Sequence, residues 1–298
     1  MASLYDQQES NIHKTWGLMA VFLIVVIGIG FAVSWYYNSS VILYAAVAFA
    51  LIMNVGSYWF SDKLVLSMNR ARPATREEFF DFYTVTENLC ITAGLPMPKL
   101  YVIDDPAPNA FSTGRNEKHA VVCATTGLLA MMNRTDLEGV IAHELSHIKN
   151  KDMLLMTMAV VLAGFVAIIA NIFLRVSFFS GGNNRDRGEG GAIIAIVAII
   201  AAILAPIAAQ LIQLAISRKR EFLADASGAL LTRYPEGLAD ALQKIGAYER
   251  PMQTTNPATA HLFISSPFGA HAMQKGLSKL FMTHPPIEDR IAALLDKK

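Results

Sequence analysis

The run His143-Glu144-Leu145-Ser146-His147 has the residue types and the spacing of a metal-binding catalytic helix. Residues four apart share one face of an α-helix, so both imidazoles can reach one Zn²⁺ ion while Glu144 addresses a water on it. Two histidines at this spacing also occur as a solvated or core pair, so the run alone does not decide the chemistry. Its surroundings favour the metal, because a helix start precedes it and a membrane-length apolar segment follows.

A catalytic zinc site needs a third protein ligand, with the fourth position left for water. Asn150 and Met153 stand where the extended form of the motif has Gly and a third His, so the ligand must come from further along the chain. If the third and fourth apolar segments form a hairpin, Glu221 returns to the membrane surface at which His147 leaves the polar region. The hairpin topology therefore favours Glu221 as the third ligand.

Other acidic residues have the same local spacing as this candidate. Glu236 and Asp240 repeat the Glu-x-x-x-Asp pattern of Glu221 and Asp225, and only proximity to the membrane separates the two pairs. Asp225 lies one turn after Glu221 on the same face, where it can accept a hydrogen bond from a ligating imidazole. We therefore predict one Zn²⁺ per chain, bound by the two histidines of the motif and Glu221, with Asp225 behind them.

The composition is that of a membrane protein. Of the 298 residues, 53% are hydrophobic and 16% are charged, against about 25% charged in an ordinary soluble domain. The net charge of +1 gives no reason to expect nucleic-acid binding. A bilayer span needs about 20 apolar residues, and four segments are long enough: 16–37, 41–60, 153–176 and 192–216.

The distribution of Lys and Arg predicts an orientation. Positive charge gathers beside the span ends that border residues 61–152 and 217–298, and the positive-inside rule places that side in the cytoplasm. The loop 177–191 is then external. Cys90 and Cys123 both fall in the cytoplasmic part, where a reducing compartment keeps thiols free.

These patterns divide the chain into four parts. We expect a tail and a first membrane hairpin in 1–60, a first polar part with the two histidines in 61–152, a second hairpin in 153–216, and a second polar part in 217–298. Capping boxes predict helices from Thr75 to Thr92 and from Thr135 onward. Further elements are strands at 99–103, 109–113 and 120–124, and helices at 217–231, 235–248 and 285–295. The predicted fold class is a mainly α membrane protein, with four transmembrane helices and a cytoplasmic α+β domain containing a small β-sheet.

Taken together, these motifs resemble the HtpX-type membrane zinc proteases, relatives of the type I CAAX prenyl proteases. The likeness is carried by residues 143–147 and 217–225 (Ser-Arg-Lys-Arg-Glu-Phe-Leu-Ala-Asp), with further matches at 109–111, 259–263 and 283–286 leading to Arg290. It implies a zincin-like (gluzincin) protease domain and a stress-linked endopeptidase of the bacterial inner membrane that degrades damaged membrane proteins. In that family His143, His147 and Glu221 bind zinc, and Glu144 is catalytic.

Three further assignments come from the resemblance, and each has a structural alternative. His284, which precedes two prolines, is either a donor to the tetrahedral oxyanion or a turn residue bonded to backbone. Arg290 braces a carboxylate, contacts the substrate backbone, or forms an ordinary salt bridge. Asn109, Ala110 and Phe111 form either a strand with Phe111 in the core or an exposed edge to which an extended substrate adds.

The leading prediction is a multi-pass, zinc-dependent endopeptidase in the lipid bilayer, with its active site facing the cytoplasm and membrane polypeptides as substrates. Glu144 would act as the general base. A protease for prenylated C-termini is an alternative, although that relative normally has more spans around a chamber. A transporter would have ionisable residues in its spans, and 153–174 and 192–216 contain none. A zinc-stabilised scaffold would have no use for Glu144. The oligomeric state is left open.

Overall fold

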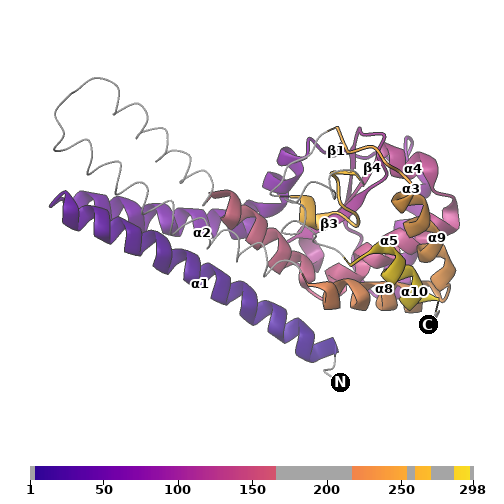
Figure 1. Ribbon diagram of the computed structural model, residues 1–298, viewed down its shortest axis with the longest axis horizontal. Helices are drawn as coiled ribbons and strands as arrows, with labels where there is room; N and C mark the ends of the chain where they lie inside the picture. The colour runs from indigo at the N-terminus through magenta and orange to yellow at the C-terminus, as the bar shows by residue number, and fades with distance from the viewer. Residues whose placement is uncertain (1–3, 166–216, 254–258, 270–284, 296–298) are drawn as a thin grey trace.

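Long helices project from one end of an α+β domain (Figure 1). The first two, α1 (Leu4–Tyr36) and α2 (Ser40–Met68), lie side by side and are joined by a short turn. The structure is a computed structural model, and it describes residues 4–165, 217–253, 259–269 and 285–295.

Both α1 and α2 are long and apolar enough to cross a membrane, with 29 residues each in the spans Gln8–Tyr36 and Ser40–Met68. Many of their large apolar side chains are exposed, including Ile24, Phe31, Tyr44 and Ile52. The first two predicted spans, 16–37 and 41–60, coincide with these helices, except that Tyr37 lies just beyond the end of α1. Of the third, the structure describes the helix Asp152–Phe165. The fourth predicted span and the loop 177–191 lie outside the described residues.

The helix Asp152–Phe165 packs against α1 and α2 through a shared apolar core. The buried residues of this core come from all three helices and are Leu18, Phe22, Val26, Ala50, Leu155, Met158, Ala159, Leu162 and Ala163. The packing fixes where this helix begins relative to α1. The polar residues just before it are therefore held close to the beginning of α1.

The sheet of the domain has four strands in the order β1-β2-β4-β3. Strands β1 (Arg72–Pro73) and β2 (Lys99–Ile103) pair antiparallel, and β2 pairs parallel with β4 (Ala120–Thr125). The edge strand β3 (Ala110–Gly114) pairs antiparallel with β4, from Ala110 opposite Ala124 to Gly114 opposite Ala120. The 3₁₀ turn η1 (Glu117–His119) joins β3 to β4.

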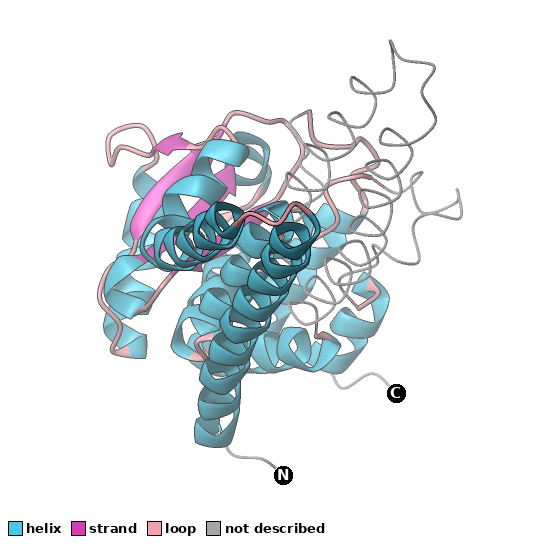
Figure 2. Ribbon diagram, turned by 90° about the vertical axis from the view of Figure 1, so that its left-hand side faces the viewer, coloured by secondary structure: helices cyan, strands magenta, loops and turns pink. Residues whose placement is uncertain are grey.

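Each face of this sheet is covered. Alternate strand residues such as Val102, Ala110 and Val122 pack against helices α3 (Phe80–Ala93) and α5 (Arg134–Lys149). The other face packs against the end of α2, the helix Asp152–Phe165 and part of the C-terminal region, through Val65, Leu66, Ile103, Phe111, Val121, Cys123, Met156, Val160, Met252, Leu262 and Phe263. In Figure 2 the strands lie to the left, with helices in front of them and behind them.

Helices α3 and α5 do not begin where the predicted capping boxes placed them, and the helices predicted at 217–231 and 285–295 begin one and two residues later than predicted. The amide of Glu78 does bond to Thr75 Oγ1, but the Glu78 carboxylate pairs with Arg72 instead of returning to the cap, so α3 begins at Phe80. It ends at Ala93, one residue beyond the predicted Thr92, and its C-cap Gly94 has a φ of 69°.

The helix that carries the two histidines, in contrast, begins before its predicted capping box. Asn133 Oδ1 accepts the amide of Asp136, and Asp136 Oδ2 accepts the amide of Asn133, so α5 begins at Arg134. Glu138, the expected acid of the box, instead lies 3.4 Å from Arg134. The two candidate boxes are offset by two residues, and the structure forms the first.

The remaining elements complete the helical layer beside α5. Helix α4 (Thr126–Met131) follows the last strand, and α8 (Arg218–Thr232), α9 (Pro235–Gly246) and α10 (Ile287–Leu294) pack together on α5 (Figure 1). The 3₁₀ turn η2 (Ala260–Leu262) lies against β3, where Phe263 packs edge-on against Phe111 at 5.0 Å between ring centroids.

A sharp break separates α5 from the helix that runs beside α1. Asn150 is the C-cap of α5, and Lys151 has a φ of 58°, in the left-handed region that non-glycine residues seldom adopt. The next helix begins at Asp152. The histidine helix therefore does not continue into the third predicted span, and Asp152 is turned back toward the last turn of α5.

Candidate metal centre

The two histidines lie on the face of α5 that meets α8. Both are buried, at 1% exposure for His143 and 5% for His147. The two helices approach closely at Gly228, where a methyl group in place of a glycine hydrogen would lie 3.0 Å from the backbone nitrogen of His143. A residue without a side chain at this crossing lets α8 bring its acidic residues over the histidines.

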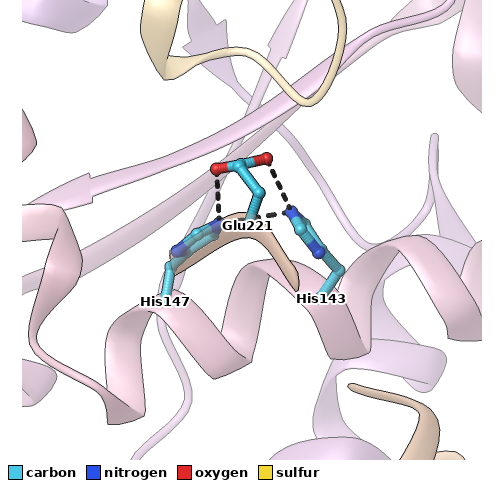
Figure 3. A group of neighbouring side chains, drawn as sticks. All are labelled: His143, His147 and Glu221. Carbon is cyan, nitrogen blue, oxygen red and sulfur yellow. Dashed lines mark hydrogen bonds and ion pairs between the residues drawn. The ribbon is translucent and has the colours of Figure 1, made fainter. Parts of the chain in front are cut away.

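Glu221 projects from α8 above both imidazoles (Figure 3). Its two carboxylate oxygens lie 3.5 Å from His147 Nε2 and 4.0 Å from His143 Nε2. The two Nε2 atoms lie 3.2 Å from each other. One ligand atom from each of the three buried residues lies within 4.8 Å of the others, which is close enough to hold one metal ion.

His143 is held from behind by Asp225 and Arg290. Its Nδ1 lies 2.9 Å from Asp225 Oδ1. Arg290 grips the same carboxylate with two hydrogen bonds, from Nε to Oδ2 at 2.8 Å and from Nη2 to Oδ1 at 2.7 Å. Its Nη1 donates to the carbonyl oxygen of Ile264 at 2.9 Å. Asp225 thus lies behind a histidine as expected, and Arg290 braces that carboxylate from a fully buried position.

His147 has an equivalent partner that the spacing of the motifs did not predict. Its Nδ1 lies 3.2 Å from Asp152 Oδ2, just beyond the break after α5. The Nδ1 atom of each histidine therefore faces a carboxylate, and the Nε2 atom of each faces Glu221. The available signal for Asp152 was an acidic residue five positions after His147, where a helix start could turn it back.

The charges around the site change the pKa of His147. Burial by itself would lower it, but the hydrogen bond to Asp152 and the negative charges of Glu221 and Glu144 outweigh burial and raise the pKa to about 9. The carboxylates thus strongly favour a positive charge at this imidazole. The same field favours a bound cation.

The Asp225 carboxylate is held in its charged form. Burial would raise its pKa, but the charge and hydrogen bonds of Arg290, with a smaller contribution from His143, hold the pKa below its usual value. The pKa of Arg290 is correspondingly raised: burial opposes this, and its pairing with Asp225 outweighs the burial. The pair therefore stays ionised behind His143.

Glu144 is buried, with 1% exposure, beside the first histidine of the motif. Its negative charge contributes to the raised pKa of His147 and of Arg290. It also adds to burial in raising the pKa of the Cys123 thiol on β4. The Glu144 carboxylate is therefore near enough to His147, Arg290 and Cys123 for its charge to act on all three.

Asn109, Ala110 and Phe111 have buried side chains at the start of the edge strand β3. Asn109 Nδ2 donates to the carbonyl oxygen of Ser265 at 2.9 Å, and the amide of Ile264 donates to the carbonyl oxygen of Ala110 at 2.8 Å. The chain around Ile264 therefore already covers the beginning of this edge. Of the remaining assignments, His284 lies outside the described residues.

Comparison with known proteins agrees with this geometry. The profile of Peptidase family M48 matches residues 78–298. A protease HtpX homolog of Caldanaerobacter subterraneus subsp. tengcongensis is 45% identical, over 98% of this chain and 97% of that protein. A protease HtpX homolog of Pyrococcus furiosus is 48% identical, over 93% of each.

The crystal structure of S. mikatae Ste24p also matches, with a TM-score of 0.47 and 18% identity over 93% of this chain and 62% of that one. Together, the family profile and the HtpX homologs cover the histidine motif, Glu221 and both candidate membrane helices. The chain therefore belongs to Peptidase family M48 and is a membrane metalloprotease.

Proposed function

We propose that this chain is a zinc-dependent endopeptidase that cleaves membrane polypeptides at the cytoplasmic surface of the bacterial inner membrane. The observation that carries the proposal is the convergence of His143, His147 and Glu221, with a carboxylate behind each imidazole. A relationship to the HtpX homologs over nearly the whole chain supports a role in the quality control of damaged membrane proteins.

The donor set fits zinc. Two imidazole nitrogens and one carboxylate are the protein ligands found in catalytic zinc sites of the His₂Glu type. Aspartates behind both imidazoles fix the ring orientation and raise ligand basicity, as outer partners do in zinc sites. The buried carboxylates also supply the negative charge that a divalent cation needs, as the raised pKa of His147 indicates.

We assign the following roles to the chain's own residues. A bound zinc ion would supply a water of lowered pKa and would polarise the scissile carbonyl. Glu144 takes the proton from the attacking water and delivers it to the leaving amine. Asp225 and Asp152 hold the two imidazoles in a fixed orientation throughout the reaction. His284 is proposed as a hydrogen-bond donor to the oxyanion, on the resemblance alone.

For the substrate we propose a place along the edge strand β3. The carbonyl of Ala110 points away from β4, toward Ile264. Along an antiparallel strand, successive residues point their backbone N–H and C=O groups to opposite sides. The N–H and C=O of Ser112 therefore also point away from β4. An extended peptide could add there through main-chain hydrogen bonds, which tolerate many side chains. The buried side chains of Asn109, Ala110 and Phe111 would support this edge. Arg290 would act on the metal centre instead, by holding the Asp225 carboxylate behind His143.

The membrane arrangement supports access to substrates that are themselves embedded in the bilayer. The metal centre lies at the end of α5, directly before the helix that packs against the membrane helices α1 and α2. The excess of Lys and Arg beside the domain supports a cytoplasmic active site under the positive-inside rule. We propose four spans, the second pair being residues 153–176 and 192–216.

The decisive experiment uses the full chain, purified in detergent with a chelator so that the protease stays inactive. Zinc is then added, and proteolysis of an unfolded membrane protein is followed on gels. We expect cleavage in the wild type, none in Glu144→Gln, and unchanged zinc binding in both. Glu138→Gln, nearer the beginning of α5 and partly exposed, serves as the matched control and should cleave normally.

Two results would refute the proposal. Chelator-sensitive cleavage at the wild-type rate by Glu144→Gln would remove the general base from the mechanism. Zinc binding without any cleavage, by wild type and variant alike, would favour a zinc-stabilised scaffold instead.

A further inference from the structure

One buried polar contact of the metal centre comes from the first membrane helix rather than from the protease domain. Asn11 lies near the beginning of α1 and is 4% exposed. Its Nδ2 lies 2.6 Å from Asp152 Oδ1 and 3.2 Å from the carbonyl oxygen of Asn150. An amide NH₂ group carries two hydrogens, so one Asn11 side chain can make both bonds.

The two oxygens of Asp152 have different partners. Oδ2 faces His147 Nδ1 at 3.2 Å, and Oδ1 faces Asn11. Arg220 adds a positive charge, with its Nε 3.9 Å from Oδ1. Because Asn11 binds the oxygen that His147 does not use, it limits rotation of the carboxylate about its own axis. The orientation of the imidazole then depends on Asn11 through Asp152.

The packing of α1 keeps Asn11 beside the break between α5 and the next helix. Further along α1, Leu18 and Phe22 are buried against Leu155, Met158 and Leu162 of the helix that begins with Asp152. Gln8, one turn before Asn11, makes a separate, exposed hydrogen bond from Nε2 to the carbonyl oxygen of Lys149 at 2.8 Å, which does not reach Asp152. The start of α1 therefore contacts both sides of the break between the two helices.

We propose that Asn11 is a positioning residue of the metal centre, which holds Asp152 in the orientation that aligns His147 for metal binding. The first membrane helix is then part of the catalytic apparatus as well as an anchor. This inference rests on the proposed function, because it takes His147 to be a zinc ligand.

The test is the zinc affinity of the full chain in detergent, measured by competition with a chromophoric chelator. Loss of an outer partner costs metal sites about 10- to 100-fold in affinity, and Asn11 acts one step further out. We therefore expect Asn11→Ala to bind zinc about 3- to 10-fold more weakly. Asn11→Asp, which places an acceptor against Asp152, should bind at least as weakly. The visible spectrum of the Co²⁺-substituted protein should shift in both variants.

Gln8→Ala is the matched control, because it removes a similar side-chain amide bond that does not reach Asp152. Its zinc affinity should stay within about twofold of the wild type. On an Asp152→Asn background, Asn11→Ala should cause no further loss, because its effect passes through Asp152. Thermal unfolding in the same detergent checks that each variant is folded.

The outcomes separate this inference from the proposed function. Wild-type affinity and spectrum in Asn11→Ala would overturn the inference alone, as would equal losses in Gln8→Ala and Asn11→Ala. A full additional loss in the double variant would also overturn it. A wild-type protein whose zinc binding is indifferent to Glu221→Gln would refute the proposed zinc site itself, and the inference with it.

Discussion

Nδ1 of His147 lies 3.2 Å from Oδ2 of Asp152, across the break between α5 and the next helix. His143 has the corresponding arrangement with Asp225, at 2.9 Å, on α8. The two imidazoles are thus anchored through their Nδ1 atoms by acids from two different helices. Both turn Nε2 toward Glu221.

Glu221→Gln should abolish tight zinc binding. An amide replaces the anionic ligand, and we expect the affinity to fall by at least about 100-fold, more than loss of an outer partner costs. Zinc content after dialysis, measured by mass spectrometry, gives the result. Glu236→Gln is the control, because Glu236 has the same sequence spacing but is exposed on α9. Equal zinc loss in the two variants would contradict the assignment.

Arg290→Met should destabilise the folded domain. It leaves Asp225 as a buried charge with less compensation, and breaking a buried pair in this way costs about 3–5 kcal/mol. Thermal unfolding in detergent, with chelator present, measures the effect without a contribution from metal. Arg134→Met is the control, because its partners Asp81 and Glu138 form exposed pairs at 3.4 Å, which are worth about 0–1 kcal/mol. Similar shifts in both variants would argue against a structural role for the Arg290 brace.

Ser112→Pro should weaken substrate binding while sparing the metal. Proline removes an N–H that faces away from β4, and one main-chain hydrogen bond contributes about 0.5–1.5 kcal/mol, or roughly 2- to 13-fold in affinity. We expect KM for an unfolded substrate to rise with little change in zinc content. Ser112→Ala, which keeps the N–H, should behave as the wild type. If the proline variant retains the wild-type KM, the substrate does not pair at this position.

Both cysteines should resist alkylation in the folded protein. Burial raises the pKa of the Cys90 thiol to about 11, and burial with the charge of Glu144 raises the pKa of Cys123 well above its usual range. A higher pKa means less thiolate at a given pH, so at pH 8 reaction should be at least about 100-fold slower than in the unfolded chain, where the thiol pKa is about 8.5. Rates with iodoacetamide from pH 7 to pH 10, with and without guanidinium, measure this. Rapid modification of the native protein at pH 8 would contradict the described burial.

The part of the site that depends on local spacing could be predicted from the sequence. His143, Glu144 and His147 share a helix, and their relative placement follows from helical geometry alone. Glu221 required one topological assumption, a hairpin that returns to the same membrane surface, and the structure does place it over both histidines.

Asp152 could not be found in this way, because its approach to His147 depends on the break between α5 and the next helix. The left-handed residue Lys151 carries no local signal, since lysine has no preference for that conformation. The residues that cover β3 could not be predicted from the sequence either. Its strand was predicted one residue early, but its cover comes from Ile264, far away in the sequence. The two-residue strand β1 is too short to have a periodic pattern.

The left-handed Lys151 follows the end of α5 and turns the chain into the helix beside α1, so the protease domain and the membrane helices meet at a bend rather than along one continuous helix. His147 lies on one side of the bend, and Asp152 and Asn11 lie on the other, tied to helices whose tilt depends on the thickness of the surrounding bilayer. If the tilt of these helices changes, we expect the change to reach the His147–Asp152 contact first. Zinc affinity measured after reconstitution in bilayers of different acyl-chain length would test this, with no residue of the protein altered.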